Sequence, residues 1–599
     1  MSPARYRAAP MEEVGPVPRA FIRRLRATGP VEKAFGAFVV YATISGLLYV
    51  RNVFAHMETW CIGGCHSDTM VYLWSLRWMP FALSQGLNPL FTTHYIWAPQ
   101  GIDLVWVTTI PGPSFVLAPV TSIWGPLASD NLILWLAPAL AAWACYLLCN
   151  QLTSHPPPAF AAGAIFGFST YVGHHMRGHV NLLLMFCVPL ACYLVVRRVQ
   201  GRIGPQAFVL LLALTLVGQF SISTEIFATM TVFGGIALLL ALLFASGEVR
   251  RALWSTTLLT GVAYLIVLVI TSPYLLEVIR NRPPGSLRPL GPNSVDLLSY
   301  VLPRSPTWLG AGTFLETTRR FSGLAQDDTA YIGPAFIAIV GLFAWFGRRS
   351  RWTWMLIAFI LVPVVFSLGP TLHIGGRASI PMPGALLAHL PVLSSVLPER
   401  FPLFAWLGIA VVVSLFLADG SGRGSWWRWG IVLVGLVTVS VALPSPPYRT
   451  PLSTPSFFTD ETYRSYLRQG ENDLLLPANV GDEMQWQEAA DFWFRQSRGY
   501  IGLAHPQGQV GNPGGSIVYV DHSADAVTPT PPNFLLYLHQ QAIASVILPA
   551  AAPAAWDELL TSLGAERIVT GGVTLYRAPS GGWPQTVPDA AMMSPEPDV

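Results

Sequence analysis

Long apolar runs separated by short polar turns occupy most of this chain, and their lengths predict membrane-spanning helices. About 20 apolar residues in helical form cross the hydrocarbon core of a bilayer. We predict about eleven spans, at residues 34–50, 131–150, 159–172, 181–197, 206–222, 226–245, 252–272, 330–347, 352–368, 402–418 and 428–444. The apolar segment 104–125 is interrupted by Pro111 and Pro113, so residues 51–130 are predicted to form one outer loop with two juxtamembrane helices.

The positions of the arginines orient the predicted spans. Short loops rich in Lys and Arg face the cytoplasm. With the N-terminus inside and 104–125 not crossing, the basic loops all fall on the cytoplasmic side; they contain Arg197, Arg198, Arg250, Arg251, Arg348, Arg349 and Arg428. The long loops 273–329 and 369–401 then lie outside, as does the chain from 445 onward.

The residues after the last predicted span alternate between strand and helix signals. Strands are predicted at 473–477 and 544–549, helices at 483–496 and 554–563, and a hairpin at 567–576. Such alternation favours a small α/β domain, and no glycine-rich nucleotide-binding motif is present in it. The predicted organisation is a basic cytoplasmic leader (1–33), a membrane domain (34–444), an extracytoplasmic α/β domain (445–580) and a disordered tail (581–599).

Composition agrees with the membrane assignment. The chain is 52% hydrophobic and only 11% charged, whereas soluble domains carry about 25% charged residues. The first apolar run follows a basic leader without a clear cleavage site, so we predict an uncleaved first span. A net charge of +3 gives no reason to expect a nucleic-acid partner.

Asp68 is the first candidate for chemistry, because it stands in the first outer loop directly ahead of a tryptophan-rich amphipathic segment. A carboxylate there can take a proton from an acceptor hydroxyl as a general base. It can equally cap the following helix. Cys61 and Cys65 precede it, and their spacing leaves free thiols, a disulfide and a metal site open.

The short second outer loop carries His174, His175, Arg177, His179 and Asn181. With His66 of the first loop, these side chains could contact a phosphate or an acceptor, or hold a divalent metal. They could also be separate interfacial residues with no common site. No cofactor is assigned from the sequence.

Charged residues at the outer ends of later spans complete the set of candidates. Arg400 suits a lipid-linked phosphate or an interfacial anchor. Glu225 lies in a very short outer turn with apolar flanks, where an acid is costly and often functional. Asp327 and Asp328 could contact sugar or acceptor, or could simply favour a helix N-terminus.

This order of features resembles the GT-C superfamily of membrane glycosyltransferases. A first span leads to an outer-loop acid, juxtamembrane helices, a second span and a short second outer loop, as in aminoarabinose transferases and protein mannosyltransferases. Four stretches are similar to uncharacterised bacterial members: Gly86-Leu-Asn88-Pro89-Leu-Phe91, Ala98-Pro99-Gln-Gly101-Ile-Asp103, Gly167-Phe-Ser-Thr-Tyr171 and Gly178-His179-Val-Asn181.

The resemblance implies an enzyme of the bacterial plasma membrane that uses a polyprenyl-phosphate sugar outside the cell and inverts the sugar. It implies Asp68 as the base, and an envelope glycan, lipid or protein as the acceptor. We expect Arg400, Arg177 and His179 at the donor phosphate, and Glu225, His66, His174, His175, Asn181, Asp327 and Asp328 along the sugar and acceptor. Many relatives carry a second acid in the second outer loop, where in some of them it binds a divalent metal. This loop has no Asp or Glu here, which argues against a reaction that depends on a hard divalent metal ion. A transporter or lipid flippase and an inactive envelope scaffold are the alternatives.

Overall fold

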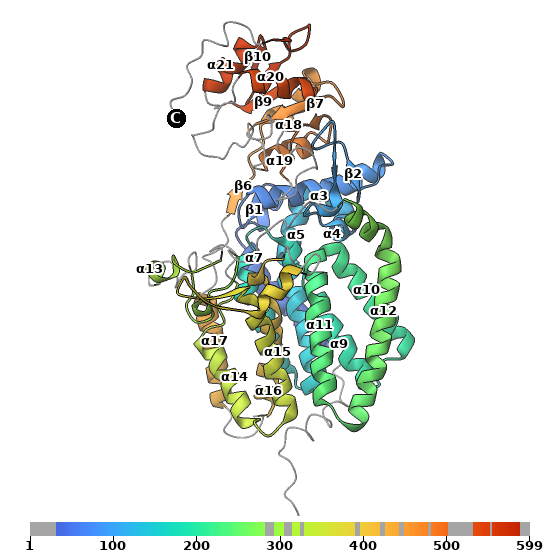
Figure 1. The fold of residues 1–599 in the computed structure, drawn as a ribbon, viewed down its shortest axis with the longest axis vertical. Helices are drawn as coiled ribbons and strands as arrows, with labels where there is room; N and C mark the ends of the chain where they lie inside the picture. The colour runs from blue at the N-terminus through green and yellow to red at the C-terminus, as the bar shows by residue number, and fades with distance from the viewer. Residues whose placement is uncertain are drawn as a thin grey trace, which may run out of the picture.

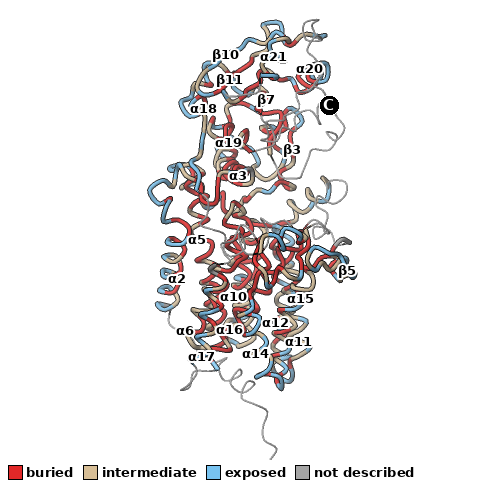
Figure 2. The backbone as a smooth tube through the Cα atoms, turned by 90° about the vertical axis from the view of Figure 1, so that its left-hand side faces the viewer, coloured by how far each residue is buried: buried red, intermediate tan, exposed pale blue. Residues whose placement is uncertain are grey.

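The structure is a computed structural model that describes residues 31–281, 293–304, 314–323, 329–389, 396–419, 426–441, 449–476, 481–500, 531–550 and 554–586. A helical bundle forms the lower part of the molecule, and helix α3 (Ser67–Ser84) lies across its upper end (Figure 1). A smaller unit of strands and helices from the C-terminal residues stands above α3. Buried residues run through the bundle and again through this upper unit (Figure 2).

Seven described helical segments are long and apolar enough to cross a membrane, which makes this a multi-pass membrane protein. They comprise α2 (Val31–Ser45) with η1 (Gly46–Val50), α5 (Ala118–Thr153), α8 (Val180–Leu183) with α9 (Cys187–Val199), α10 (Pro205–Ile222), α11 (Thr224–Phe244), α12 (Gly247–Arg280), and η8 (Pro398–Arg400) with α16 (Pro402–Asp419).

Shorter helices occupy the other predicted spans. They are α6 (Pro156–Gly167), α14 (Pro334–Phe346), α15 (Arg351–Ser367) and α17 (Trp426–Val441). A helix therefore lies at every predicted span, while the number that crosses the bilayer stays a prediction. Two helices extend beyond their predicted ends: α5 begins at Ala118, with a break in the helix at Gly125, and α12 ends at Arg280.

The first outer loop holds the predicted juxtamembrane helices. Segment 104–125 forms no single helix: it is divided among η3 (Leu104–Trp106), α4 (Pro111–Val116) and the start of α5, where Gly125 has a φ of +82°. The rest of the loop contains η2 (Phe54–His56), β1 (Trp60–Ile62), α3, β2 (Thr92–Thr93) and β3 (Ile102–Asp103). The second outer loop contains α7 (Thr170–His175). The later loops contain η4 (Leu297–Tyr300), α13 (Leu315–Thr318), β4 (Thr371–Ile374), β5 (Arg377–Pro381) and η6 (Pro383–His389).

The C-terminal residues form a five-stranded mixed sheet in the order β10-β11-β9-β7-β8. Strand β7 is parallel to β8 and β9, and the other pairings are antiparallel. The elements in chain order are β6 (Arg449–Pro451), α18 (Ser456–Thr459), η9 (Thr462–Ser465), β7 (Asn472–Leu475), α19 (Asp482–Ala489), β8 (Arg495–Gln496), α20 (Pro531–Gln540), β9 (Ser545–Pro549), α21 (Ala554–Ser562), β10 (Glu566–Thr570) and β11 (Val573–Arg577).

One predicted element of this unit is wrong at its end. The helix expected over 483–496 stops at Ala489, because Asp491 and Phe492 adopt positive φ angles, and Arg495–Gln496 then pair with β7. The C-terminal hairpin turns at Gly571 and Gly572 as predicted. The domain boundaries remain predictions.

The C-terminal unit, residues 449–586, packs directly on the first outer loop. Strand β6 pairs with β1 in antiparallel register, and α19 packs against α3. Trp74 Nε1 donates to Gln487 Oε1 at 3.0 Å, and Arg77 forms an ion pair with Asp491 at 2.9 Å. This contact brings residues from the end of the chain close to Asp68.

Candidate active site

Asp68 lies in the first turn of α3, where the helix dipole favours a negative charge. The N-cap residue is His66, whose side chain makes no capping hydrogen bond. The Asp68 carboxylate instead contacts two side chains outside α3: Oδ2 lies 3.1 Å from His179 Nε2, and Oδ1 accepts a hydrogen bond of 2.7 Å from the Tyr500 hydroxyl. The alternative interpretation of Asp68 as a helix cap therefore does not describe its contacts.

The surroundings of Asp68 keep it ionised. Burial by itself raises the pKa of the carboxyl, but the hydrogen bonds and charge of His179, the Tyr500 hydroxyl and the charge of His66 outweigh it and hold the pKa well below its usual range. The Asp68 side chain is still 37% exposed. An anionic carboxylate is thus accessible to a substrate at the upper end of the bundle.

Two glycines bring the first and second outer loops together. A Cβ on Gly63 would come within 2.3 Å of the Met176 carbonyl oxygen, and one on Gly178 within 2.4 Å of His66 Cε1. Both glycines have positive φ angles, +83° and +100°. Only glycine permits this backbone geometry and this close approach without strain, and the approach places His179 against Asp68.

Cys61 and Cys65 form a disulfide in the first of these loops, so one of the three alternatives left open by their spacing is found. The backbone N–H of Cys65 donates to Thr450 Oγ1 at 2.9 Å. The disulfide loop is therefore held between the second outer loop on one side and β6 on the other.

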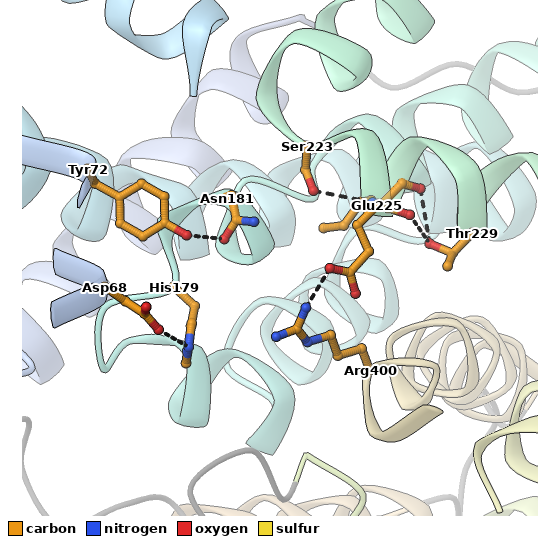
Figure 3. A network of polar contacts seen from close by, with 9 residues as sticks. Asp68, Tyr72, His179, Asn181, Ser223, Glu225, Thr229 and Arg400 are labelled. Carbon is orange, nitrogen blue, oxygen red and sulfur yellow. Dashed lines mark hydrogen bonds and ion pairs between the residues drawn. The ribbon is translucent and has the colours of Figure 1, made fainter. Parts of the chain in front are cut away.

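The second outer loop positions the other predicted polar residues. Asn181 Oδ1 accepts a hydrogen bond of 2.7 Å from the Tyr72 hydroxyl of α3 (Figure 3). His174 and His175 are buried; His174 Nδ1 lies 2.9 Å from the Thr170 carbonyl oxygen. The His175 ring packs edge-on to His179 with centroids 5.4 Å apart, and burial lowers its pKa well below the usual value. Arg177 lies between these groups in sequence and is partly exposed.

Glu225 and Arg400 form the second charged pair of the region. Arg400 Nη1 lies 2.5 Å from Glu225 Oε2, and the two side chains are only 10% and 21% exposed, respectively. Ser223 caps α11 by accepting from the Ile226 N–H, which sets Glu225 in the first turn. In Figure 3 this pair lies to the right of the Asp68–His179 pair, and the Tyr72–Asn181 hydrogen bond lies above the Asp68–His179 pair.

Most of the predicted site residues therefore gather at one end of the bundle, and two lie outside the described residues. Asp327 and Asp328 fall in that undescribed part of the chain. Among the residues that the structure describes, no group of three or more His, Cys, Asp or Glu side chains is arranged to hold a metal ion.

Sequence reasoning missed Tyr500 and Tyr72, which bond directly to predicted residues. Tyr72 was visible only as part of an aromatic-rich amphipathic helix. Tyr500 is separated from Asp68 by 432 positions, and it follows the segment whose secondary structure was predicted wrongly. No local signal connects the two residues.

The chain matches the family model described as "Domain of unknown function (DUF6311)" over residues 37–442. No curated protein matches it. Among solved structures, the arabinofuranosyltransferase AftD from Mycobacteria aligns with a TM-score of 0.58 at 12% identity, covering 92% of this chain and 40% of that one. This chain thus spans well under half of the length of AftD.

Two structures of the Archaeoglobus fulgidus oligosaccharyltransferase align less closely. The form tethered to an acceptor peptide gives a TM-score of 0.51 at 12% identity, and the complex with Zn and sulfate gives 0.50 at 11%. They cover 86% of this chain each, and 69% and 68% of the oligosaccharyltransferase, respectively. At such identities the likeness concerns the fold alone. The chain belongs to the DUF6311 family, and its fold is that of the GT-C membrane glycosyltransferases.

Proposed function

We propose that this protein is a glycosyltransferase that moves a sugar from a polyprenyl-phosphate donor to an envelope glycan, lipid or protein on the extracytoplasmic side of the bacterial plasma membrane. The observation that carries the proposal is the Asp68 carboxylate. It is anionic, accessible, and held from both sides at the end of the bundle. The GT-C fold supports this class of reaction without identifying the sugar or the acceptor.

In the proposed reaction the acceptor hydroxyl attacks the anomeric carbon of the donor sugar. The bond between this carbon and the phosphate oxygen breaks, and polyprenyl phosphate leaves with the electron pair. Asp68 takes the hydroxyl proton as the new bond forms, a contribution typically worth 10²–10⁴-fold in rate. Attack from the face opposite the phosphate inverts the sugar.

Arg400 is the proposed ligand of the donor phosphate, with Arg177 and His179 as further candidates. A guanidinium has five N–H donors in a planar fork, a geometry that suits the oxygens of a phosphate. Glu225 would then hold Arg400 in place. His66, His174, His175 and Asn181 would line the space for sugar and acceptor.

The proposed orientation follows from the basic turns. The turns between α11 and α12 and between α14 and α15 lie at the end of the bundle away from α3 (Figure 1), and arginines stand in them or directly beside them. Placing these turns in the cytoplasm puts Asp68 and the C-terminal unit outside.

Purified wild type and Asp68→Asn, assayed for polyprenyl phosphate release from a panel of polyprenyl-phosphate sugars, test the proposal. We expect wild-type turnover and a loss of at least about 100-fold in the variant. Turnover that survives the substitution would remove Asp68 from the mechanism. Wild type that binds donor lipids but consumes none would favour the flippase or scaffold alternatives.

A further inference from the structure

The segment that precedes Tyr500 is hydrogen-bonded to the first outer loop. The Gln496 N–H donates to the Tyr95 carbonyl at 2.9 Å, and the Ala98 N–H donates back to the Gln496 carbonyl at 3.0 Å. Further along, Trp97 Nε1 donates to the Gly499 carbonyl at 3.0 Å. The C-terminal chain therefore follows the outer loop side by side up to Tyr500.

Tyr500 itself is anchored through its backbone. Its N–H donates to Glu483 Oε1 at 2.8 Å, and the other carboxylate oxygen of Glu483 accepts from the Gly481 N–H at 2.9 Å. Glu483 is buried, and a Cβ on the neighbouring Gly499 would lie 2.9 Å from Met484 Sδ. The position of residue 500 is thus set by close packing against α19.

From this anchored position the Tyr500 side chain reaches Asp68. Its hydroxyl donates to Oδ1 at 2.7 Å while His179 holds Oδ2 at 3.1 Å. Each carboxylate oxygen has two lone-pair directions, so both bonds can persist while one remaining lone pair accepts a proton from a substrate. The two partners restrain the carboxylate from opposite sides, one from the second outer loop and one from the C-terminal unit.

We propose that Tyr500 is a positioning residue for the transfer reaction: the C-terminal unit completes the active site by orienting the Asp68 carboxylate toward the acceptor. This inference rests on the proposed glycosyltransferase function. It gives the C-terminal unit a part in the reaction, because Tyr500 of this unit holds the Asp68 carboxylate. The orientation matters because a base must meet the hydroxyl proton within hydrogen-bond reach.

The experiment compares wild type, Tyr500→Phe, Tyr576→Phe and Asp68→Asn as full-length proteins in the donor-release assay. Tyr576→Phe is the matched control, because it also removes a phenol–carboxylate hydrogen bond of the C-terminal unit, to Asp557, away from Asp68. We expect Tyr500→Phe to lower kcat about tenfold, as for the loss of one hydrogen bond to a charged group. The KM for the donor and the melting temperature should stay at wild-type values.

The pH profile separates positioning from a merely structural role. The Tyr500 hydroxyl helps to lower the pKa of Asp68; its removal raises that pKa, so protonation inactivates the base at a higher pH. We expect the acid limb of the rate profile of Tyr500→Phe to move to higher pH, and that of Tyr576→Phe to stay in place.

Different failures have different meanings. If Asp68→Asn is inactive while Tyr500→Phe keeps wild-type kcat and pH profile, the inference falls and the proposed function stands. A kcat that rises in Tyr500→Phe also overturns the inference, since the hydroxyl would then block the base. Wild type without turnover on any donor overturns both.

Discussion

At the scale of the residue, substitution of His179 tests whether its contact with Asp68 positions the carboxylate and lowers its pKa. His179→Ala removes the partner of Oδ2, which is the strongest of the interactions that lower the pKa of Asp68. With the pKa raised, the carboxylate is protonated at a higher pH. As the pH is lowered, activity should therefore be lost at a higher pH than in wild type. We expect kcat to fall about tenfold to 100-fold at neutral pH. A pH–rate profile checks both effects, and an unchanged profile would contradict the assignment.

The ion pair between Glu225 and Arg400 leads to a prediction about the stability of the protein. Glu225→Gln leaves the guanidinium of Arg400, only 10% exposed, without its carboxylate. Loss of one partner of a buried pair costs about 3 kcal/mol. The control is Glu316→Gln, which breaks an exposed pair with Arg319 and should cost about 0.5 kcal/mol or less.

Melting temperatures of both variants in the same detergent measure this difference. We expect a clear fall for Glu225→Gln and almost none for Glu316→Gln. Equal falls would mean that the Glu225–Arg400 pair adds no more to stability than a surface pair does.

At the scale of the element, the contact between the first and second outer loops depends on the absence of a side chain. Gly63→Ala forces a Cβ into the backbone of Met176 and Arg177, at 2.3 and 2.9 Å. Gly86→Ala is the control, because Gly86 also has a positive φ, +68°, but no atom lies within 4 Å of its Cβ position. Both variants share the backbone strain of about 1 kcal/mol.

The two variants separate steric displacement from strain. We expect Gly63→Ala to lower turnover more than about tenfold by moving His179 away from Asp68, while Gly86→Ala stays near wild type. Turnover and protein yield are measured together. Equal activities would show that the loop contact does not position the site.

The elements themselves were largely predictable, and their partners were not. Apolar runs such as 206–222 and 226–245 predict α10 and α11 because membrane helices satisfy their own backbone groups locally. The Gly571-Gly572 hairpin follows from local turn chemistry in the same way. By contrast, β1 pairs with β6, and Tyr500 meets Asp68, across hundreds of residues. Such pairings depend on the packing of α19 on α3, which no short pattern encodes.

At the scale of the whole molecule, the proposed orientation predicts which surfaces face outward. Gly86 follows α3, and Gly201 lies in the turn between α9 and α10, one of the arginine-rich turns that we assign to the cytoplasm. Both are exposed, with no atom near their Cβ positions, so a cysteine at either site should be reachable by a reagent. The native cysteines interfere little, because Cys61 and Cys65 are paired, Cys145, Cys149 and Cys187 are buried, and Cys192 is only partly exposed.

A membrane-impermeant maleimide on intact cells or spheroplasts then reads the orientation. We expect Gly86→Cys to be labelled directly, and Gly201→Cys only after the membrane is permeabilised, because the arginine-rich turns belong in the cytoplasm. The protein without an introduced cysteine gives the background. If only Gly201→Cys were labelled in intact cells, the orientation would be the opposite of the proposed one, with Asp68 on the cytoplasmic face. Nucleotide sugars are available there, so the reason for a lipid-linked donor would be removed.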